Sequence, residues 1–217
     1  LEHLERMKIS PHVPLLITGD TGSGKELIAQ FMHYEVDEAQ GEYLAVNCSN
    51  MNKELFEAEL FGYEKGAFTG ADEKGKKGYI EQASNGTLFL DEISEIDLDI
   101  QAKLLRVLET GDYYRVGGRK KQKVKGRLIF ATNRDLFKLT KKDAFREDLF
   151  YRLNIVNVQI PPLSQRKEEI VPMIFYFIKQ QNKELNKAVK FIEPQVLKLL
   201  YAYKWPGNMR ELKNFIT

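Results

Sequence analysis

A glycine-rich loop near the start of the chain constrains its fold most. The loop has the spacing G-x-x-x-x-G-K and lies between the apolar run 15–18 and the segment 25–34, whose apolar residues recur at helical spacing. In such a loop, glycines let main-chain N–H groups approach a phosphate, and the helix N-terminus adds partial positive charge. The order of strand, loop, lysine and helix predicts a phosphate site in an α/β fold, the alternative being a glycine-rich turn that only precedes a helix. The loop residues are Gly19, Asp20, Thr21, Gly22, Ser23, Gly24, Lys25 and Glu26.

The residue after the loop lysine departs from the usual pattern. Loops of this spacing ordinarily carry Ser or Thr there, and the hydroxyl helps to hold Mg²⁺. This chain has Glu26 instead, so that hydroxyl is absent. Lys25 is still placed to reach the outer phosphates of a nucleotide as a point charge.

Short apolar runs alternate with helical segments over the first three quarters of the chain, which predicts a parallel five-stranded sheet flanked by helices. The expected strands are 15–18, 44–47, 87–90, 128–131 and 155–160, and the clearest helix is 97–109, with Gly111 just beyond it. Pro161 and Pro162 then mark a break, after which helices are expected at 167–181, at 194–203 and from Pro206. We therefore expect an α/β subdomain at 1–162 and a small α-helical subdomain at 163–217 whose last helix looks cut short.

Composition limits the cellular locations that we expect for the protein. No stretch reaches about 18 consecutive apolar residues and the N-terminus carries no apolar run, which argues against a membrane span or a signal peptide. The lone cysteine, Cys48, excludes an internal disulfide framework and fits a reducing, cytoplasmic location. We expect Cys48 to be a packed small residue and not a nucleophile.

The charge is unevenly distributed. The formal net charge is +2, from 33 Lys and Arg against 31 Asp and Glu. Outside the segment 115–127, 26 cations face 31 acids. Such a basic block either binds nucleic acid or forms a solvated hairpin, and the sequence leaves both open. The segment holds no acid and seven cations, namely Arg115, Arg119, Lys120, Lys121, Lys123, Lys125 and Arg127.

Two acids, Asp91 and Glu92, close the expected strand 87–90. In an open parallel sheet, ligands bind beyond the carboxyl ends of the strands. A carboxylate there can hold Mg²⁺, directly or through its waters, and a neighbouring one can orient or deprotonate an attacking water. The alternative is an acid that caps the following helix.

The hexapeptide Gly66-Ala67-Phe68-Thr69-Gly70-Ala71, preceded by Glu59-Leu60-Phe61-Gly62-Tyr63-Glu64-Lys65, resembles the signature of the bacterial enhancer-binding proteins. These are NtrC-like, sigma-54-dependent transcription activators whose central domain is an AAA+ P-loop NTPase with an α-helical lid. The resemblance extends to Trp205-Pro206-Gly207-Asn208-Met209-Arg210-Glu211-Leu212-Lys213-Asn214, and Glu26 after the loop lysine is also typical of this family.

The resemblance implies roles for individual residues. The loop Gly19 to Glu26, with Leu27, corresponds to a Walker A motif that binds ATP or ADP, and Asp91 with Glu92 to a Walker B pair that holds Mg²⁺ and activates water. Asn47 resembles the asparagine that restrains the Walker B glutamate, although a turn residue at a strand end is the alternative. Thr132 and Asn133 resemble sensor I, and Arg210 resembles sensor II.

Arg146 and Arg152 resemble arginine fingers, which neutralise charge on the phosphoryl group in a neighbour's site. The alternative is a surface helix whose salt bridges use Glu147 and Asp148. Fingers that act in trans imply self-association into a ring, for which the family predicts a hexamer ahead of a heptamer.

The implied function is that of an ATP-hydrolysing motor domain that remodels closed complexes of sigma-54 RNA polymerase into open ones. A loop at 62–74, with Gly66 to Ala71 at its tip, would contact sigma-54, and a basic hairpin at 112–127 would lie near promoter DNA. The resemblance also implies two-component signalling and a separate domain, outside this chain, that binds enhancer DNA. The rival interpretations are another AAA+ machine of clamp-loader or helicase type, and a nucleic-acid-binding module built on 115–127.

Overall fold

The computed structural model describes residues 13–36, 40–50, 52–68 and 72–217. These residues form two compact units, which we describe separately. The first comprises 13–18 and the described part of 26–158, and the second comprises Gly19–Lys25 with Gln159–Thr217. Among the described residues, no helix is both long enough and apolar enough to cross a membrane.

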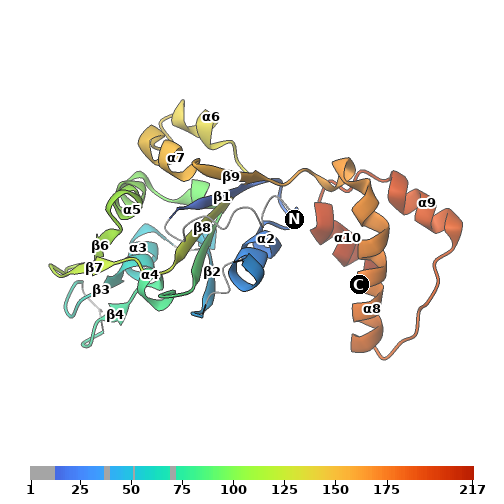
Figure 1. The fold of residues 1–217 in the computed structure, drawn as a ribbon, viewed down its shortest axis with the longest axis horizontal. Helices are drawn as coiled ribbons and strands as arrows, with labels where there is room; N and C mark the ends of the chain where they lie inside the picture. Colours follow the sequence, from blue (N-terminus) through green and yellow to red (C-terminus); the bar gives the residue numbers. More distant parts are fainter. Residues whose placement is uncertain (1–12, 37–39, 51, 69–71) are drawn as a thin grey trace. The chain divides into compact units, whose positions relative to one another are not determined.

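A five-stranded sheet forms the first unit's centre (Figure 1), in the order β2 (Tyr43–Asn47), β5 (Thr87–Asp91), β8 (Arg127–Thr132), β1 (Leu15–Thr18) and β9 (Val156–Gln159). The pairs β2–β5, β5–β8 and β1–β8 are parallel, which confirms the predicted α/β sheet. The register sets Asn47 beside Asp91 and Thr18 beside Thr132, so the polar ends of these strands share one edge. The phosphate loop begins at the next residue after Thr18.

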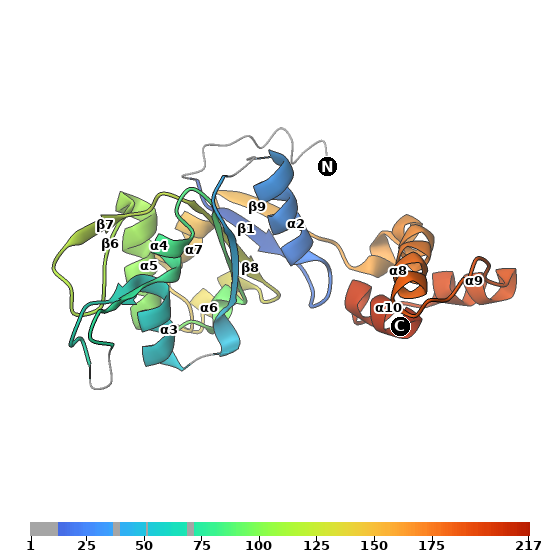
Figure 2. The same ribbon diagram turned by 90° about the horizontal axis from the view of Figure 1, so that it is seen from below.

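Helices cover both faces of this sheet, as buried parallel strands require. Figure 2 shows α2 (Lys25–Phe31) on one side and α3 (Lys53–Phe61) and α5 (Leu98–Thr110) on the other. The core beneath α5 includes Ile100 and Leu104, both essentially inaccessible to solvent. The remaining short elements are a π-helical turn (Met32–Val36), α4 (Tyr79–Gln82), α6 (Leu136–Thr140), α7 (Glu147–Leu153), and the hairpins β3 (Gly62–Tyr63) with β4 (Lys76–Lys77) and β6 (Asp112–Tyr114) with β7 (Lys121–Lys123).

Helix ends differ from the predicted ones by a few residues, for physical reasons. The helix predicted at 25–34 is α-helical only to Phe31 and then widens into the π-helical turn. The helix predicted at 97–109 is α5, with Asp97 at its N-cap and Gly111 in the left-handed conformation at φ 71°, as a helix stop requires.

The second unit contains the predicted helical segment. Its helices are α8 (Ile170–Glu184), α9 (Pro194–Ala202) and α10 (Asn208–Ile216), preceded by the 3₁₀ turns Leu163–Gln165 and Lys167–Glu169. A separate apolar core includes Ile174, Trp205 and Leu212. The last helix starts at Asn208 and not at Pro206, and Trp205 and Asn208 take positive φ values of 50° and 54°, outside the right-handed helical range.

Candidate active site

The predicted phosphate loop wraps tightly and uses its glycines. Gly22 and Gly24 have φ values of 75° and 103°, which side-chain-bearing residues rarely adopt. Lys25 is 7% exposed, and its ammonium group donates to the carbonyls of Gly19, at 3.0 Å, and Asp20, at 3.4 Å. The lysine therefore folds back over its own loop, from where it can exchange these carbonyls for phosphate oxygens.

Other predicted nucleotide residues lie around this loop. Asp20 and Thr21 are exposed on the loop, and Glu26 and Leu27 are exposed on the first turn of α2. Arg210 is exposed on α10, close to the loop: a Cβ atom added to Gly22 would lie 2.9 Å from its Cβ. The second unit thus brings Arg210 to the phosphate loop.

Asp91 and Glu92 end β5 in contrasting conformations. Asp91 is the last strand residue, and one of its carboxylate oxygens accepts the Glu92 N–H at 2.9 Å. Glu92 takes the left-handed conformation at φ 54°, a costly one for glutamate that is found mainly where function requires it. This turn directs the two successive carboxylates differently, so they are suited to different tasks.

The two predicted sensor I residues, Thr132 and Asn133, make different hydrogen bonds. Asn133 donates its main-chain N–H to the Glu92 carboxylate at 3.4 Å. The buried Thr132 hydroxyl donates to Ser94 and accepts from the Arg134 N–H, so it serves local packing. Of this pair, Asn133 is therefore the residue brought to the catalytic glutamate candidate.

Asn47 lies beside Asp91 in the sheet register, as its predicted role requires. Its side-chain oxygen accepts from the main-chain N–H of Ser49 at 2.9 Å and from the Ser49 hydroxyl at 2.6 Å. This is the geometry of a strand-end turn, which is the alternative weighed for this residue.

Cys48 follows Asn47 and is buried, at 4% exposure, as expected for a packed small residue. Burial raises the pKa of its thiol well above the usual range, and the negative charges of Asp91 and Glu92 raise that pKa further. A thiol held protonated is a poor nucleophile, so Cys48 carries no chemistry of its own.

The carboxylates at the end of β5 suit Mg²⁺ better than a metal ion that is coordinated only by protein side chains. Within the parts of the chain that the structure describes, no three His, Cys, Asp or Glu side chains are grouped to hold a metal ion. Magnesium commonly takes one or two carboxylates and completes its shell with water and phosphate oxygens. Asp91 at the strand end fits that pattern.

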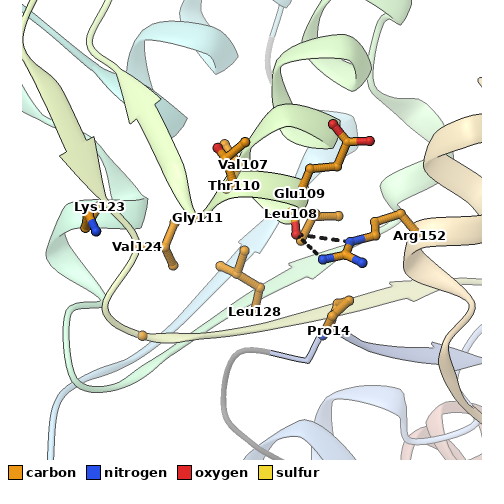
Figure 3. Close-up of a pocket in the computed structure, with 11 residues that line it drawn as sticks. Pro14, Val107, Leu108, Glu109, Thr110, Gly111, Lys123, Val124, Leu128 and Arg152 are labelled. Atoms are coloured by element: carbon orange, nitrogen blue, oxygen red, sulfur yellow. Dashed lines mark hydrogen bonds between the residues drawn. The ribbon is translucent and has the colours of Figure 1, made fainter.

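The two predicted arginine fingers are held differently. Arg146, at the N-cap of α7, forms two hydrogen bonds with the Asp148 carboxylate, at 3.0 and 2.6 Å, and its side chain is 40% exposed. Arg152 directs two guanidinium nitrogens at the carbonyl of Leu108, at 3.0 and 2.7 Å, near the end of α5 (Figure 3). It lines a cavity of about 360 Å³ beside that helix end. Arg146 is thus the more accessible finger candidate, whereas Arg152 ties α7 to α5.

The hexapeptide loop presents an aromatic side chain. Phe68 is 45% exposed and its ring meets the Tyr63 ring edge-on at 5.1 Å. Gly66 has a φ of 72° and open space where a side chain would be. Thr69, Gly70 and Ala71 lie outside the described residues.

The base of the hexapeptide loop is joined to the turn of the basic hairpin, which follows Tyr114. Val116 pairs with Tyr63, through the Val116 N–H donating to Gly62 and the Glu64 N–H donating to Val116. Arg115 adds ion pairs with Glu64 and Glu81 at 3.3 and 2.7 Å. Residues 112–114 and 121–123 pair as an antiparallel hairpin, and the turn between them is anchored to the loop that carries Phe68.

Three of the seven cations of the segment 115–127 are ion-paired or buried. Arg115 is ion-paired as described, Lys121 pairs with Asp112 at 3.0 Å, and Arg127 is only 3% exposed. The exposed cations are Arg119, Lys120, Lys121, Lys123 and Lys125, of which Lys121 is the one paired with Asp112. The surface available to a polyanion is thus smaller than the sequence count suggests.

Two candidate functional residues were not identified from the sequence. Arg166 and Asn208 each donate a side-chain hydrogen bond to a carbonyl of the phosphate loop. Asn208 lay within the motif 205–214 already noted, so an asparagine after Pro-Gly was the available signal. Nothing in the local sequence singled out Arg166.

Two known protein families match the two segments of the chain. A family model described as Sigma-54 interaction domain matches residues 1–159, and one described as AAA+ ATPase lid domain matches 164–217. The chain is 48% identical over 202 residues to the regulatory protein AtoC of Escherichia coli K12, covering 93% of this chain and 44% of that protein. It is 46% identical over 202 residues to the transcriptional regulator NtrC of Proteus hauseri, covering 93% and 42%.

Solved structures agree with these matches. NtrX from Brucella abortus in complex with ADP has a TM-score of 0.89 at 37% identity, covering 99% of this chain and 46% of that one. The same protein in complex with ATP has a TM-score of 0.87 at 36% identity, with the same coverage. The chain spans less than half the length of the curated relatives it matches.

Proposed function

Because this chain belongs to the sigma-54 interaction domain family and is the central AAA+ domain of a sigma-54-dependent activator, we propose that it hydrolyses ATP to drive transcription initiation. The work done is the remodelling of the closed complex of sigma-54 RNA polymerase into an open one. The observation that carries this proposal is the catalytic pair Asp91 and Glu92, with Glu92 held in a left-handed turn and oriented by Asn133.

The residues divide the reaction between them. The loop N–H groups and Lys25 bind the phosphates of ATP. Glu92 takes a proton from a water whose oxygen attacks the terminal phosphorus, and the bond to the ADP oxygen breaks, giving ADP and phosphate. Asp91 would hold Mg²⁺, which neutralises charge on the phosphate oxygens when bound. Asn133 orients Glu92, and Asn47 would exchange its bonds to Ser49 for the same carboxylate in another nucleotide state.

Completion of the site requires a second copy of the chain. Arg146 would reach the nucleotide of a neighbouring protomer and stabilise charge on the transferred phosphoryl group, with Arg152 as the second finger candidate. Such fingers imply a ring, for which we propose six protomers. Arg210 would act on the nucleotide of its own protomer.

Contact with sigma-54 would be made by the hexapeptide loop. Phe68 offers an exposed apolar anchor, and Gly66 gives the loop freedom to change conformation. The contact between the base of this loop and the turn of the basic hairpin supports a shared movement as the nucleotide changes.

The test combines hydrolysis with partner capture. The ATPase rate per protomer should rise with protein concentration, because each site needs a neighbour's arginine, and Lys25→Ala should abolish the rate. In the presence of a transition-state mimic of ATP, the protein should retain sigma-54 on a column. A concentration-independent rate contradicts fingers in trans, and failure to retain sigma-54 favours another AAA+ machine of clamp-loader or helicase type.

A further inference from the structure

Three consecutive carbonyls of the phosphate loop are bound by donors from the α-helical segment of the same unit. The Thr21 carbonyl accepts from the Asn208 side-chain amide at 3.2 Å, and the Gly22 carbonyl accepts from the Met209 main-chain N–H at 3.0 Å. The Ser23 carbonyl accepts from the Arg166 guanidinium at 2.6 Å. The donors come from two separate places, the 3₁₀ turns before α8 and the first turn of α10.

This arrangement determines which way the loop N–H groups point. In a trans peptide the carbonyl of one residue and the N–H of the next lie on opposite sides. Fixing the Thr21 and Ser23 carbonyls toward the helical segment therefore turns the N–H groups of Gly22 and Gly24 away from it. The intervening Ser23 N–H closes the loop on the Asp20 carbonyl at 3.1 Å. N–H groups turned to one side of a loop form a site for phosphate oxygens.

The contact between the phosphate loop and the start of α10 is close, and its residues have little conformational freedom. Asn208 is 1% exposed, and its side-chain oxygen accepts from the Leu163 N–H at 2.7 Å while its amide reaches Thr21. Its φ of 54° is one that asparagine adopts more readily than most residues. A Cβ on Gly22 would lie 2.5 Å from the Gly207 carbonyl, so only glycine permits this approach.

The Arg166 side chain is also held by two contacts. One guanidinium nitrogen donates to the Ser23 carbonyl, and another pairs with Glu169 at 2.9 Å. Its side chain is 15% exposed. The two hydrogen-bonded arms fix the planar guanidinium in a way that a lysine ammonium cannot reproduce.

We propose that Asn208 and Arg166 are positioning residues that hold the phosphate loop in its phosphate-binding form. The helical segment is then coupled to nucleotide binding through the loop carbonyls, in addition to any direct contact with the nucleotide. By linkage, phosphates bound to the loop N–H groups strengthen the attachment of the helical segment to the same peptides. This inference rests on the proposed nucleotide binding.

The test uses two variants with matched controls. Arg166→Lys keeps the charge but loses the planar donors, and its control is Lys183→Arg, the reverse exchange at an exposed position of α8. Asn208→Gly keeps the positive φ and loses the side chain. Its control is Asn182→Ala, because Asn182 also makes two side-chain hydrogen bonds to main chain, both to Val189 within the helical segment.

Calorimetry on the full chain should give ADP affinities roughly threefold to tenfold weaker for Arg166→Lys and for Asn208→Gly, the range expected for losing one hydrogen bond. The controls should stay within about twofold of the wild type. The ratio of ADP to AMP affinity should fall as well, because the loop binds the second phosphate, whereas a general defect of folding weakens both ligands alike.

Hydrogen exchange supplies an independent readout. ADP should slow exchange of the Met209 amide, which donates to the Gly22 carbonyl, and this effect should shrink in Arg166→Lys. Variants that fold, bind ADP as tightly as the wild type and keep the ADP-to-AMP ratio overturn the inference while the proposed function stands. A wild-type chain that binds neither ADP nor ATP overturns the proposed function and this inference together.

Discussion

The main-chain N–H of Asn133 donates to the carboxylate of Glu92 over 3.4 Å, linking the ends of β8 and β5. Glu92 stands in a left-handed turn, and its neighbour Asp91 remains in the strand. One carboxylate is thus oriented by a fixed main-chain donor while the other ends the strand beside Asn47. Two adjacent acids with different surroundings are what a division between water activation and metal binding requires.

Glu92→Gln should bind ATP and barely hydrolyse it. The amide is nearly isosteric and cannot accept a proton from water, and losing a general base typically lowers a rate by about 10²- to 10⁴-fold. ATP affinity by calorimetry and phosphate release under saturating ATP measure the two effects separately. Glu95→Gln, which alters an acid paired with Arg134, is the control and should hydrolyse normally. Normal turnover by Glu92→Gln excludes Glu92 as the base.

Much of this site could be predicted because its functional residues come directly after the ends of strands. The loop after β1, the acids after β5 and the polar pair after β8 each follow a short apolar run, and parallel topology places such ends at one edge. The helices α4 and α6 were not predicted, since they span only four and five residues and show no full helical period.

Side-chain partners were less predictable than positions. The family resemblance implied Asn47 as the restraint on Glu92, with a strand-end turn as the alternative, and in this structure Asn133 donates to Glu92 while Asn47 accepts from Ser49. The contact of Arg166 with Ser23 joins residues 143 positions apart. Such a pairing depends on tertiary packing and leaves no local pattern in the sequence.

Phe68→Ala should abolish retention of sigma-54 while sparing ATP hydrolysis. Phe68 is 45% exposed on the hexapeptide loop, and truncating an aromatic anchor at an interface typically costs about 2 kcal/mol or more. Phe175→Ala is a matched control, because Phe175 is 43% exposed on α8. Capture of sigma-54 with a transition-state mimic, beside the ATPase rate, tests both claims. A fall in both activities for Phe68→Ala means that the loop is needed for hydrolysis itself.

Arg115→Gln should destabilise the protein and loosen the hexapeptide loop from the basic hairpin. Arg115 is largely buried between Glu64 and Glu81, and losing hydrogen bonds to charged groups costs about 1.5 to 3 kcal/mol. Lys77→Gln is the control, since Lys77 is an exposed partner of the same Glu81 at 3.6 Å and should cost less than about 1 kcal/mol. Denaturant unfolding measures both. Equal, small effects would mean that the Arg115 ion pairs contribute no anchoring.

The basic hairpin should give the assembled protein a weak, salt-dependent affinity for duplex DNA. Lys120, Lys123 and Lys125 are exposed, and each phosphate contact contributes about −0.9 to the slope of log affinity against log salt. Replacing these three lysines with Gln should make that slope shallower by up to about 2.7. A triple replacement of Lys187, Lys190 and Lys198 in the helical segment is the control. Absent or salt-independent binding leaves the hairpin as a solvated structural element.

Arg146→Ala should lose ATPase activity and regain part of it when mixed with Lys25→Ala. The first variant keeps its own nucleotide site, and the second keeps its arginines, so mixed assemblies hold active sites only if Arg146 acts on a neighbour. The exposed pair of Arg146 with Asp148 should contribute less than about 1 kcal/mol, so the free energy of unfolding should barely change. Arg152→Gln should differ: losing its bonds to the Leu108 carbonyl costs roughly 1 to 3 kcal/mol within the single chain, which no partner can restore. ATPase titrations of the mixtures, with unfolding of each variant alone, separate the two arginines. Failure of the Arg146→Ala mixture to recover, with both chains shown to assemble, contradicts a finger role in trans.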